Sequence, residues 1–198
     1  LNKNFKNFKI SFYFNMINSD ILLSVLIDDD YEKLSDLIAN VTDLTFHKTS
    51  NKYKYPIFLE SSEGAPLLFI AAYFGSRQCY EYLLNEQSDI PNFKYSLLTY
   101  ACAGGNMSIV RDVASRFPIE FNKLGISFKG NPGFQAVRHG NLDVIKWLLL
   151  KDYKFESEEI FEACLLGYYE IFNFLFENVD YYKAKLKIYD DMIISSCL

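Results

Sequence analysis

The chain has 198 residues and a formal net charge of −5 at pH 7, and half of its residues are apolar. This composition excludes a disordered chain, which would be poor in apolar residues. It also argues against nucleic-acid binding, because phosphate neutralisation needs clustered Lys and Arg and the sequence holds only four Arg. The longest uninterrupted apolar run, Leu67–Phe74, is far shorter than the roughly 20 residues of a bilayer-spanning helix. We therefore expect no integral membrane segment.

The N-terminal segment carries Lys3, Lys6 and Lys9 among several aromatic residues. A secretory signal needs a continuous apolar centre, and these lysines interrupt it. We therefore expect an intracellular, cytoplasmic protein with reduced thiols. The chain does not begin with Met, so residues 1–19 are expected to be a poorly ordered leader or a fragment edge. Attachment of this segment to a membrane surface is the alternative, although one short segment anchors weakly.

A pattern of small, glycine and apolar residues recurs along the chain. In each copy a small residue lies four positions before a glycine, and apolar residues lie five, eight and nine positions after it. The copies begin at Ala71, Ala101, Ala136 and Ala163, and their glycines are Gly75, Gly105, Gly140 and Gly167. A weaker copy precedes them, with Asp29 at the place of the glycine. A first repeat is expected to be atypical because one of its faces has no neighbouring repeat.

Each copy predicts two helices joined at the glycine, which supplies the backbone conformation of a tight turn. One helix pair cannot bury its own apolar face, so the pairs must stack. The pattern therefore predicts a single all-α array over residues 20–198, with an insertion at 40–60. The units are expected at about 20–40, 65–87, 96–117, 131–152 and 158–180, with a partial unit at 186–198.

Three segments resemble the ankyrin repeat family. Residues 140–149 are close to the family's glycine, spacer and Val-x-x-Leu-Leu helix, and residues 105–110 match the first half of that motif. Residues 66–72 resemble the opening Thr-Pro-Leu-His-x-Ala-Ala. The resemblance covers about residues 20–180 and is similar above all to the divergent, aromatic-rich arrays of protozoan proteins. It implies a solenoid of stacked helix-turn-helix repeats with short hairpin loops.

The chain departs from the family at the place of its histidine. The residues found there are Phe69, Thr99, Phe134 and Phe161. We therefore expect aromatic packing in place of the hydrogen bonds that the family's Thr and His make.

The cysteines do not form a recognisable site. Cys79, Cys102, Cys164 and Cys197 include no Cys-x-x-Cys pair, so neither zinc nor a disulfide framework is indicated. A cysteine nucleophile with His139 as its base is one hypothesis. However, Cys102 and Cys164 occupy the same position of two repeats, which fits small core residues better.

The acidic residues also have simple structural explanations. The run at residues 28–30 lacks the glycine and the distal glutamate of a calcium loop. Four glutamates near a helix start fit a solvated face: Glu156, Glu158, Glu159 and Glu162. No glycine-rich phosphate motif is present. We therefore expect no catalytic, cofactor-binding or metal-binding residues, no cofactor, and no enzymatic activity.

The resemblance implies binding to other proteins through a concave surface, to which the two residues before each glycine and the hairpin tips contribute. Aromatic and arginine side chains often dominate binding energy, so the expected contact residues are Tyr73, Phe74, Arg138, His139, Leu165, Tyr53, Tyr55, Phe93 and Tyr95. Packing of Tyr73 and Phe74 against the insertion is an equally good explanation of those two residues.

The predicted function is therefore that of a non-enzymatic protein–protein interaction module. We expect an unknown protein partner and no nucleic acid. We expect the chain to be a monomer or part of a longer array. The alternatives are a passive scaffold fragment of a larger multidomain protein and a thiol-dependent enzyme.

Overall fold

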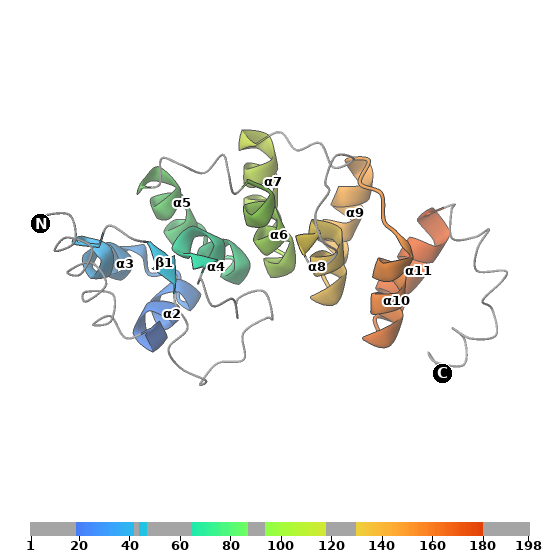
Figure 1. The fold of residues 1–198 in the computed structure, drawn as a ribbon, viewed down its shortest axis with the longest axis horizontal. Coiled ribbons are helices and arrows are strands. Elements are labelled where there is room, and N and C mark those ends of the chain that lie inside the picture. The colour runs from blue at the N-terminus through green and yellow to red at the C-terminus, as the bar shows by residue number, and fades with distance from the viewer. Residues whose placement is uncertain (1–18, 42–43, 47–64, 87–93, 118–129, 180–198) are drawn as a thin grey trace, which may run out of the picture. The chain divides into compact units, whose positions relative to one another are not determined.

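The computed structural model describes residues 19–41, 44–46, 65–86, 94–117 and 130–179 (Figure 1). The chain divides into two compact units, Leu1–Asn92 and Phe93–Leu198, and each is described by itself. The predicted leader at 1–18, most of the insertion and the predicted partial repeat at 186–198 lie outside the described residues. Across the described ranges, each helix is too short or too polar to cross a bilayer.

The first unit contains two helix pairs and a short ladder. Its elements are α2 (Ser19–Ile27), α3 (Tyr31–Ile38), β1 (Thr45–Phe46), β2 (Ala65–Pro66), α4 (Leu67–Phe74) and α5 (Arg77–Glu86). Helix α2 packs on α4 and α3 packs on α5. The fully buried side chains include Leu26, Leu34, Ile70 and Tyr80, which come from all four helices. The pairs therefore stack as the apolar spacing predicts, because neither pair could bury these residues alone.

The two strands pair at the ends of the predicted insertion. They are antiparallel, with Thr45 opposite Pro66 and Phe46 opposite Ala65. The backbone N–H of Leu67 also donates to the carbonyl oxygen of Leu44 over 2.7 Å. This ladder leads directly into α4.

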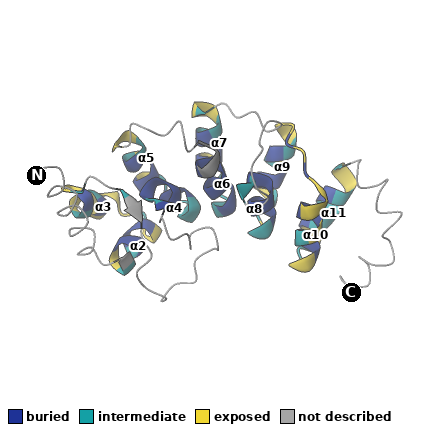
Figure 2. Ribbon diagram, viewed as in Figure 1, coloured by how far each residue is buried: buried dark blue, intermediate teal, exposed yellow. Residues whose placement is uncertain are grey.

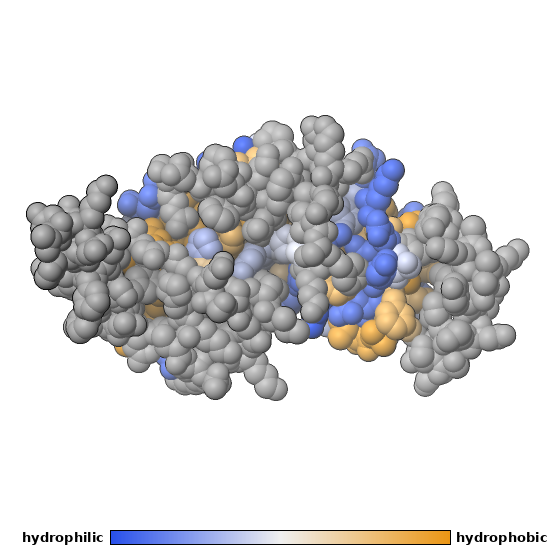
Figure 3. Space-filling model, viewed as in Figure 1, coloured by the Kyte–Doolittle hydropathy of each residue, from blue (hydrophilic) through white to orange (hydrophobic). Residues whose placement is uncertain are grey.

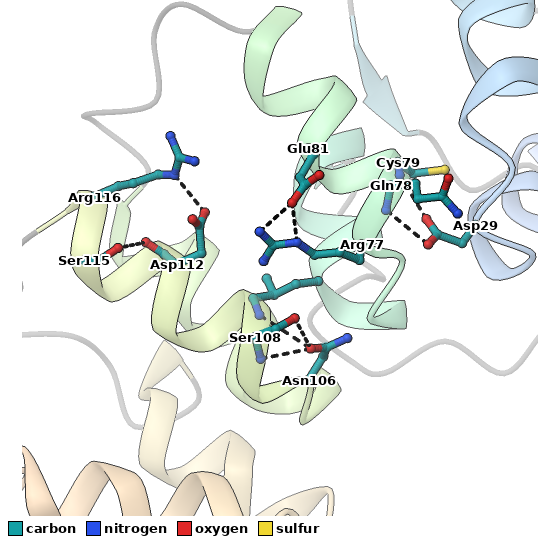
Figure 4. Close-up of polar contacts among 11 residues, drawn as sticks. Asp29, Arg77, Gln78, Cys79, Glu81, Asn106, Ser108, Asp112, Ser115 and Arg116 are labelled. Atoms are coloured by element: carbon teal, nitrogen blue, oxygen red, sulfur yellow. Dashed lines mark hydrogen bonds and ion pairs between the residues drawn. The ribbon is translucent and has the colours of Figure 1, made fainter.

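Asp29 takes the place of a turn glycine in the first repeat. Its φ of 56° is left-handed, a region that Asp tolerates better than most residues. Its carboxylate accepts hydrogen bonds from the backbone N–H groups of Gln78 (3.0 Å) and Cys79 (2.9 Å) at the start of α5 (Figure 4). An anion is favourable at a helix N-terminus, where N–H groups are unpaired. Asp29 thus forms the turn of one repeat and caps a helix of the next.

Among the described residues, the second unit has three helix pairs. Its helices are α6 (Lys94–Gly104), α7 (Met107–Arg116), α8 (Pro132–Arg138), α9 (Leu142–Leu150), α10 (Ser157–Leu165) and α11 (Tyr169–Asn178). The first helices of the pairs lie side by side, with α8 packed against both α6 and α10 (Figure 1). Helix α8 is accordingly buried along almost its whole length (Figure 2). The fold is all-α, as predicted, apart from the two-residue strands.

The repeated small residues and glycines have the roles that the pattern predicts. Ala71, Ala101, Ala136 and Ala163 are all completely buried. Gly75, Gly105, Gly140 and Gly167 all have a left-handed φ, between 70° and 78°. Small residues therefore let neighbouring helices approach, and the glycines end the first helix of each pair.

Consecutive repeats of the second unit are also joined at their turns. The side-chain amide of Asn141 donates to the carbonyl oxygens of Cys102 (2.8 Å) and Ala103 (2.7 Å) at the end of α6. A Cβ atom on Gly105 would come within 2.5 Å of the Asn141 side chain. In the next repeat, a Cβ atom on Gly140 would lie 3.5 Å from the ring of Tyr168. The turns at Gly105 and Gly140 are thus each covered by a residue of the following repeat.

The prediction that the glutamates at the start of α10 form a solvated face is wrong for Glu159, because this residue is buried. One carboxylate oxygen accepts a hydrogen bond from the backbone N–H of Glu156 (2.9 Å), and the other accepts one from the hydroxyl of Tyr153 (3.1 Å). The Tyr153 hydroxyl also contacts the side chain of Asn131. Burial raises the pKa of Glu159. The acid is retained in the core because it caps its own helix.

Candidate protein-binding surface

The two residues before each turn glycine, here called the turn positions, lie at the end of the first helix of a repeat. The first turn position lies two residues after the buried small residue, so its side chain points about 200° around the helix axis from that residue. It therefore faces away from the core in most repeats. Ala103 is the exception, since it is buried.

In the first unit, Tyr73 and Phe74 occupy the turn positions of α4. Both are partly buried, and their rings meet edge to face with centroids 5.1 Å apart. Burial raises the pKa of the Tyr73 hydroxyl, so it stays a neutral donor. The pair offers an ordered aromatic edge, while most of the insertion that could cover it lies outside the described residues. Both explanations of this pair therefore stay predictions.

In the second unit, Arg138 extends from α8 toward α10. Its Nε lies 3.9 Å from a carboxylate oxygen of Glu162, and both side chains keep some exposure. A surface ion pair of this length contributes little to stability. The guanidinium thus lies near an acid of the neighbouring repeat and keeps donors for a partner.

His139 is less exposed than its position in the repeat predicts, because its ring is partly buried. The ring Nδ1 lies 2.9 Å from the carbonyl oxygen of Gln135. Burial is the main cause that lowers the pKa of His139, and the adjacent Arg138 lowers it further. The ring is therefore neutral at pH 7, and a bond to Gln135 requires the proton on Nδ1.

Helix α10 ends at Leu165, and both Leu165 and the following C-cap residue, Leu166, are exposed. Hydrophobic surface gathers over this end of α10 (Figure 3). Leu165 is 61% exposed, whereas Ala103 at the equivalent position is buried. The first repeat also exposes Ile27 at such a position.

The predicted hairpin-tip contacts stay untested. Tyr53, Tyr55 and Phe93 lie outside the described residues, and of Tyr95 the structure describes only the backbone, in α6.

The cysteines have the properties of core residues. Cys79 and Cys102 are free and buried. Burial raises the pKa of the Cys79 thiol to about 12, with a further contribution from Asp29, and burial also raises the pKa of Cys102. Neither thiol would supply a thiolate at pH 7, which is the reactive form. Cys164 is buried as well.

Other chemistry has no visible centre in the described part of the chain. Among these residues, no group of three or more His, Cys, Asp or Glu side chains could hold a metal ion. Phe161 is the residue whose exposure the sequence pattern missed. Its equivalents Phe69 and Phe134 are buried, as aromatic packing predicts, but Phe161 is half exposed.

Part of the chain is similar to known repeat proteins. The family model described as ankyrin repeats (3 copies) matches residues 68–159. A crystal structure of the human ASB11 ankyrin repeat domain is 20% identical, covers 79% of this chain and 67% of that chain, and has a TM-score of 0.49. No curated protein matches the sequence. Residues 68–159 are matched as ankyrin repeats, in agreement with the repeats that the sequence pattern predicts there.

Proposed function

We propose that this chain is a non-enzymatic protein-binding module that contacts a partner protein through its turn positions. Ankyrin repeats are in general protein–protein interaction modules, and the family is typically non-enzymatic. The observation that supports this choice of surface is the kind of side chain found there. Aromatic, arginine and leucine residues stand at the turn positions, where Tyr73, Phe74 and Arg138 are partly buried and Leu165 is exposed.

The proposed contacts differ between the two units. The first unit contributes Tyr73 and Phe74, which are already packed on each other and so lose little entropy on binding. The second contributes Arg138, His139 and Leu165. Burial of a Leu side chain stabilises a complex by roughly 1.5–3 kcal/mol, and an arginine can bind a carboxylate through two parallel hydrogen bonds. The partner surface that fits is apolar, with at least one acidic group opposite Arg138.

Cys79 and Cys102 do not favour the alternative of a thiol-dependent enzyme, because both are buried with raised pKa values. We also propose a cytoplasmic location, for which the support is the lysines that interrupt the N-terminal apolar segment.

Affinity capture from a lysate of the source cell tests the proposed surface. The native chain is compared with a variant that combines Tyr73→Ala, Phe74→Ala and Arg138→Ala. A matched control combines Tyr31→Ala and Arg111→Ala, which remove an aromatic and an arginine from exposed positions of second helices. Circular dichroism confirms that all three are folded.

A protein captured by the native chain and the control, and lost by the turn-position variant, supports the proposal. Equal capture by all three forms contradicts it, because the contact would then lie elsewhere. Loss of capture by the control as well would also contradict the choice of surface.

A further inference from the structure

One position of the repeat is buried in the earlier repeats of the second unit and exposed in the last. Thr99 and Phe134, two residues before the small residue, are both buried, and Phe134 is only 3% exposed. The hydroxyl of Thr99 donates to the carbonyl oxygen of Gly130, just before α8 (2.7 Å). The equivalent Phe161 is 50% exposed. The position that is buried in α6 and α8 is thus exposed to solvent in α10.

The packing of the first helices explains this difference. Helix α8 packs on α6, and α10 packs on α8. Each first helix therefore covers the one before it, and the described residues include no first helix beyond α10. Leu165 and Tyr169 are exposed with Phe161, at 61% and 74%. These three residues form what we call the end face.

The equivalents of the other two residues support this explanation. Arg138 stands at the position of Leu165 and contacts Glu162 of the following repeat. Leu142 stands at the position of Tyr169 and is partly buried. An apolar end face of three large side chains is unfavourable in water and is the kind of patch that another element covers.

The sequence that follows α11 has the pattern of another first helix. Ser196-Cys197-Leu198 repeats the small, Cys, Leu order of residues 163–165. In this register Ile193 corresponds to Ile160, which is buried in α10. Residues 151–156 connect α9 to α10. In the same register, residues 179–189 lie between α11 and Asp190, the equivalent of Ser157 at the start of α10.

Charge also favours this segment over a second copy of the same face. Helices α10 and α11 carry Glu158, Glu162 and Glu170. Two such acidic surfaces would repel each other. The segment after α11 has no net charge, because Lys183, Lys185 and Lys187 balance Asp180, Asp190 and Asp191. It therefore meets the acidic end of α10 and α11 with less electrostatic repulsion than a second acidic surface would.

We propose that residues 186–198 of this chain dock on the end face as the first helix of a further repeat, with Ile193 against α10. The contact is intramolecular, so its occupancy does not depend on protein concentration. It is independent of the proposed function, except that it would cover part of Leu165.

Photo-crosslinking of the full chain tests this contact. The amino acid p-benzoylphenylalanine is incorporated in place of Phe161, where it preserves an aromatic ring. A control carries it in place of Leu150, which is 82% exposed on α9. After irradiation, the crosslinked peptides are identified by mass spectrometry. We expect the Phe161 probe to join residues 186–198 within one chain, at a yield that does not change on dilution, and the Leu150 probe to give no such product.

A crosslink between two copies, a crosslink to another segment, or no crosslink at all at the Phe161 position would overturn the proposal. A second variant adds Ile193→Asp to the chain with the Phe161 probe. A charge at this contact should lower the yield about tenfold, whereas Asp191→Lys, at the equivalent of the exposed Glu158, should preserve it. An undiminished yield with Ile193→Asp would show that the segment does not dock in this register.

Discussion

Asn141 joins two consecutive repeats through a side-chain amide that donates two hydrogen bonds. Its acceptors are the carbonyl oxygens of Cys102 and Ala103, at 2.8 and 2.7 Å. Asn141 also precedes α9 as its N-cap residue, but its side chain makes no capping bond there. Local helix preference therefore predicts little effect of Asn141→Asp on stability, whereas the inter-repeat contact predicts a loss of stability. Asp is as good as Asn at an N-cap, yet a carboxylate cannot donate to the two carbonyl oxygens.

The structure gives a magnitude for this change. Each hydrogen bond contributes about 1 kcal/mol net, so Asn141→Ala should lower the free energy of unfolding by about 2 kcal/mol. Asn141→Asp should cost more, about 3 kcal/mol, because its charge would face two carbonyl oxygens in a partly buried site. The cost arises between repeats and not within α9.

Urea unfolding measures both effects, followed by circular dichroism and by the fluorescence of the single tryptophan, Trp147. The control is Asn106→Ala, because the Asn106 side chain accepts from the backbone N–H of Ser108 (3.0 Å) within its own helix start. Loss of such a cap costs about 1 kcal/mol. If Asn141→Asp were as stable as the native chain, or no less stable than Asn106→Ala, the inter-repeat bonds would not hold the turns together.

Three further stability measurements test other parts of the structure. Gly105→Ala should destabilise more than Gly167→Ala, because both have a left-handed φ but only Gly105 has a neighbour within 4 Å; equal midpoints in urea would refute the contact. Burial raises the pKa of Glu159 above its ordinary 4.5, so ionisation favours the unfolded state and the stability of the native chain relative to Glu159→Gln should fall as the pH rises from around 4 to around 7. A pH-independent difference would contradict this environment. Ala136→Asp should cost several kcal/mol by burying an unpaired charge, whereas Leu150→Asp on the exposed side of α9 should leave the melting temperature unchanged; a stable Ala136→Asp variant would disprove the register of the repeats.

Much of the fold can be predicted from the local sequence pattern, because the same pattern occurs in each repeat. The small residue and the glycine recur at fixed spacing, so the buried alanines and the left-handed turns could be placed from the sequence alone. Asp29 was assigned to a glycine position by the same spacing, and its positive φ confirms that assignment. Its cap on α5 could not be predicted, because it depends on how closely the next repeat approaches.

The features that were missed depend on contacts between repeats. Glu159 looks like a surface residue in sequence, since acids are common at helix starts. It is buried because Tyr153 and its own helix start supply hydrogen-bond partners. Phe161 was grouped with Phe69 and Phe134 by its place in the repeat, but its exposure depends on whether a further helix packs against α10. A sequence pattern identifies equivalent positions, and their burial is decided by the neighbouring repeat.

The dissociation constant of the complex with the captured partner tests the central claim most directly. It is measured by isothermal titration calorimetry for the native chain, for Arg138→Ala and for the control Arg111→Ala. A residue that dominates binding contributes about 2 kcal/mol or more, so Arg138→Ala should weaken binding by about 30-fold, while Arg111→Ala should leave the constant unchanged. Equal constants for all three chains would contradict binding through the turn positions.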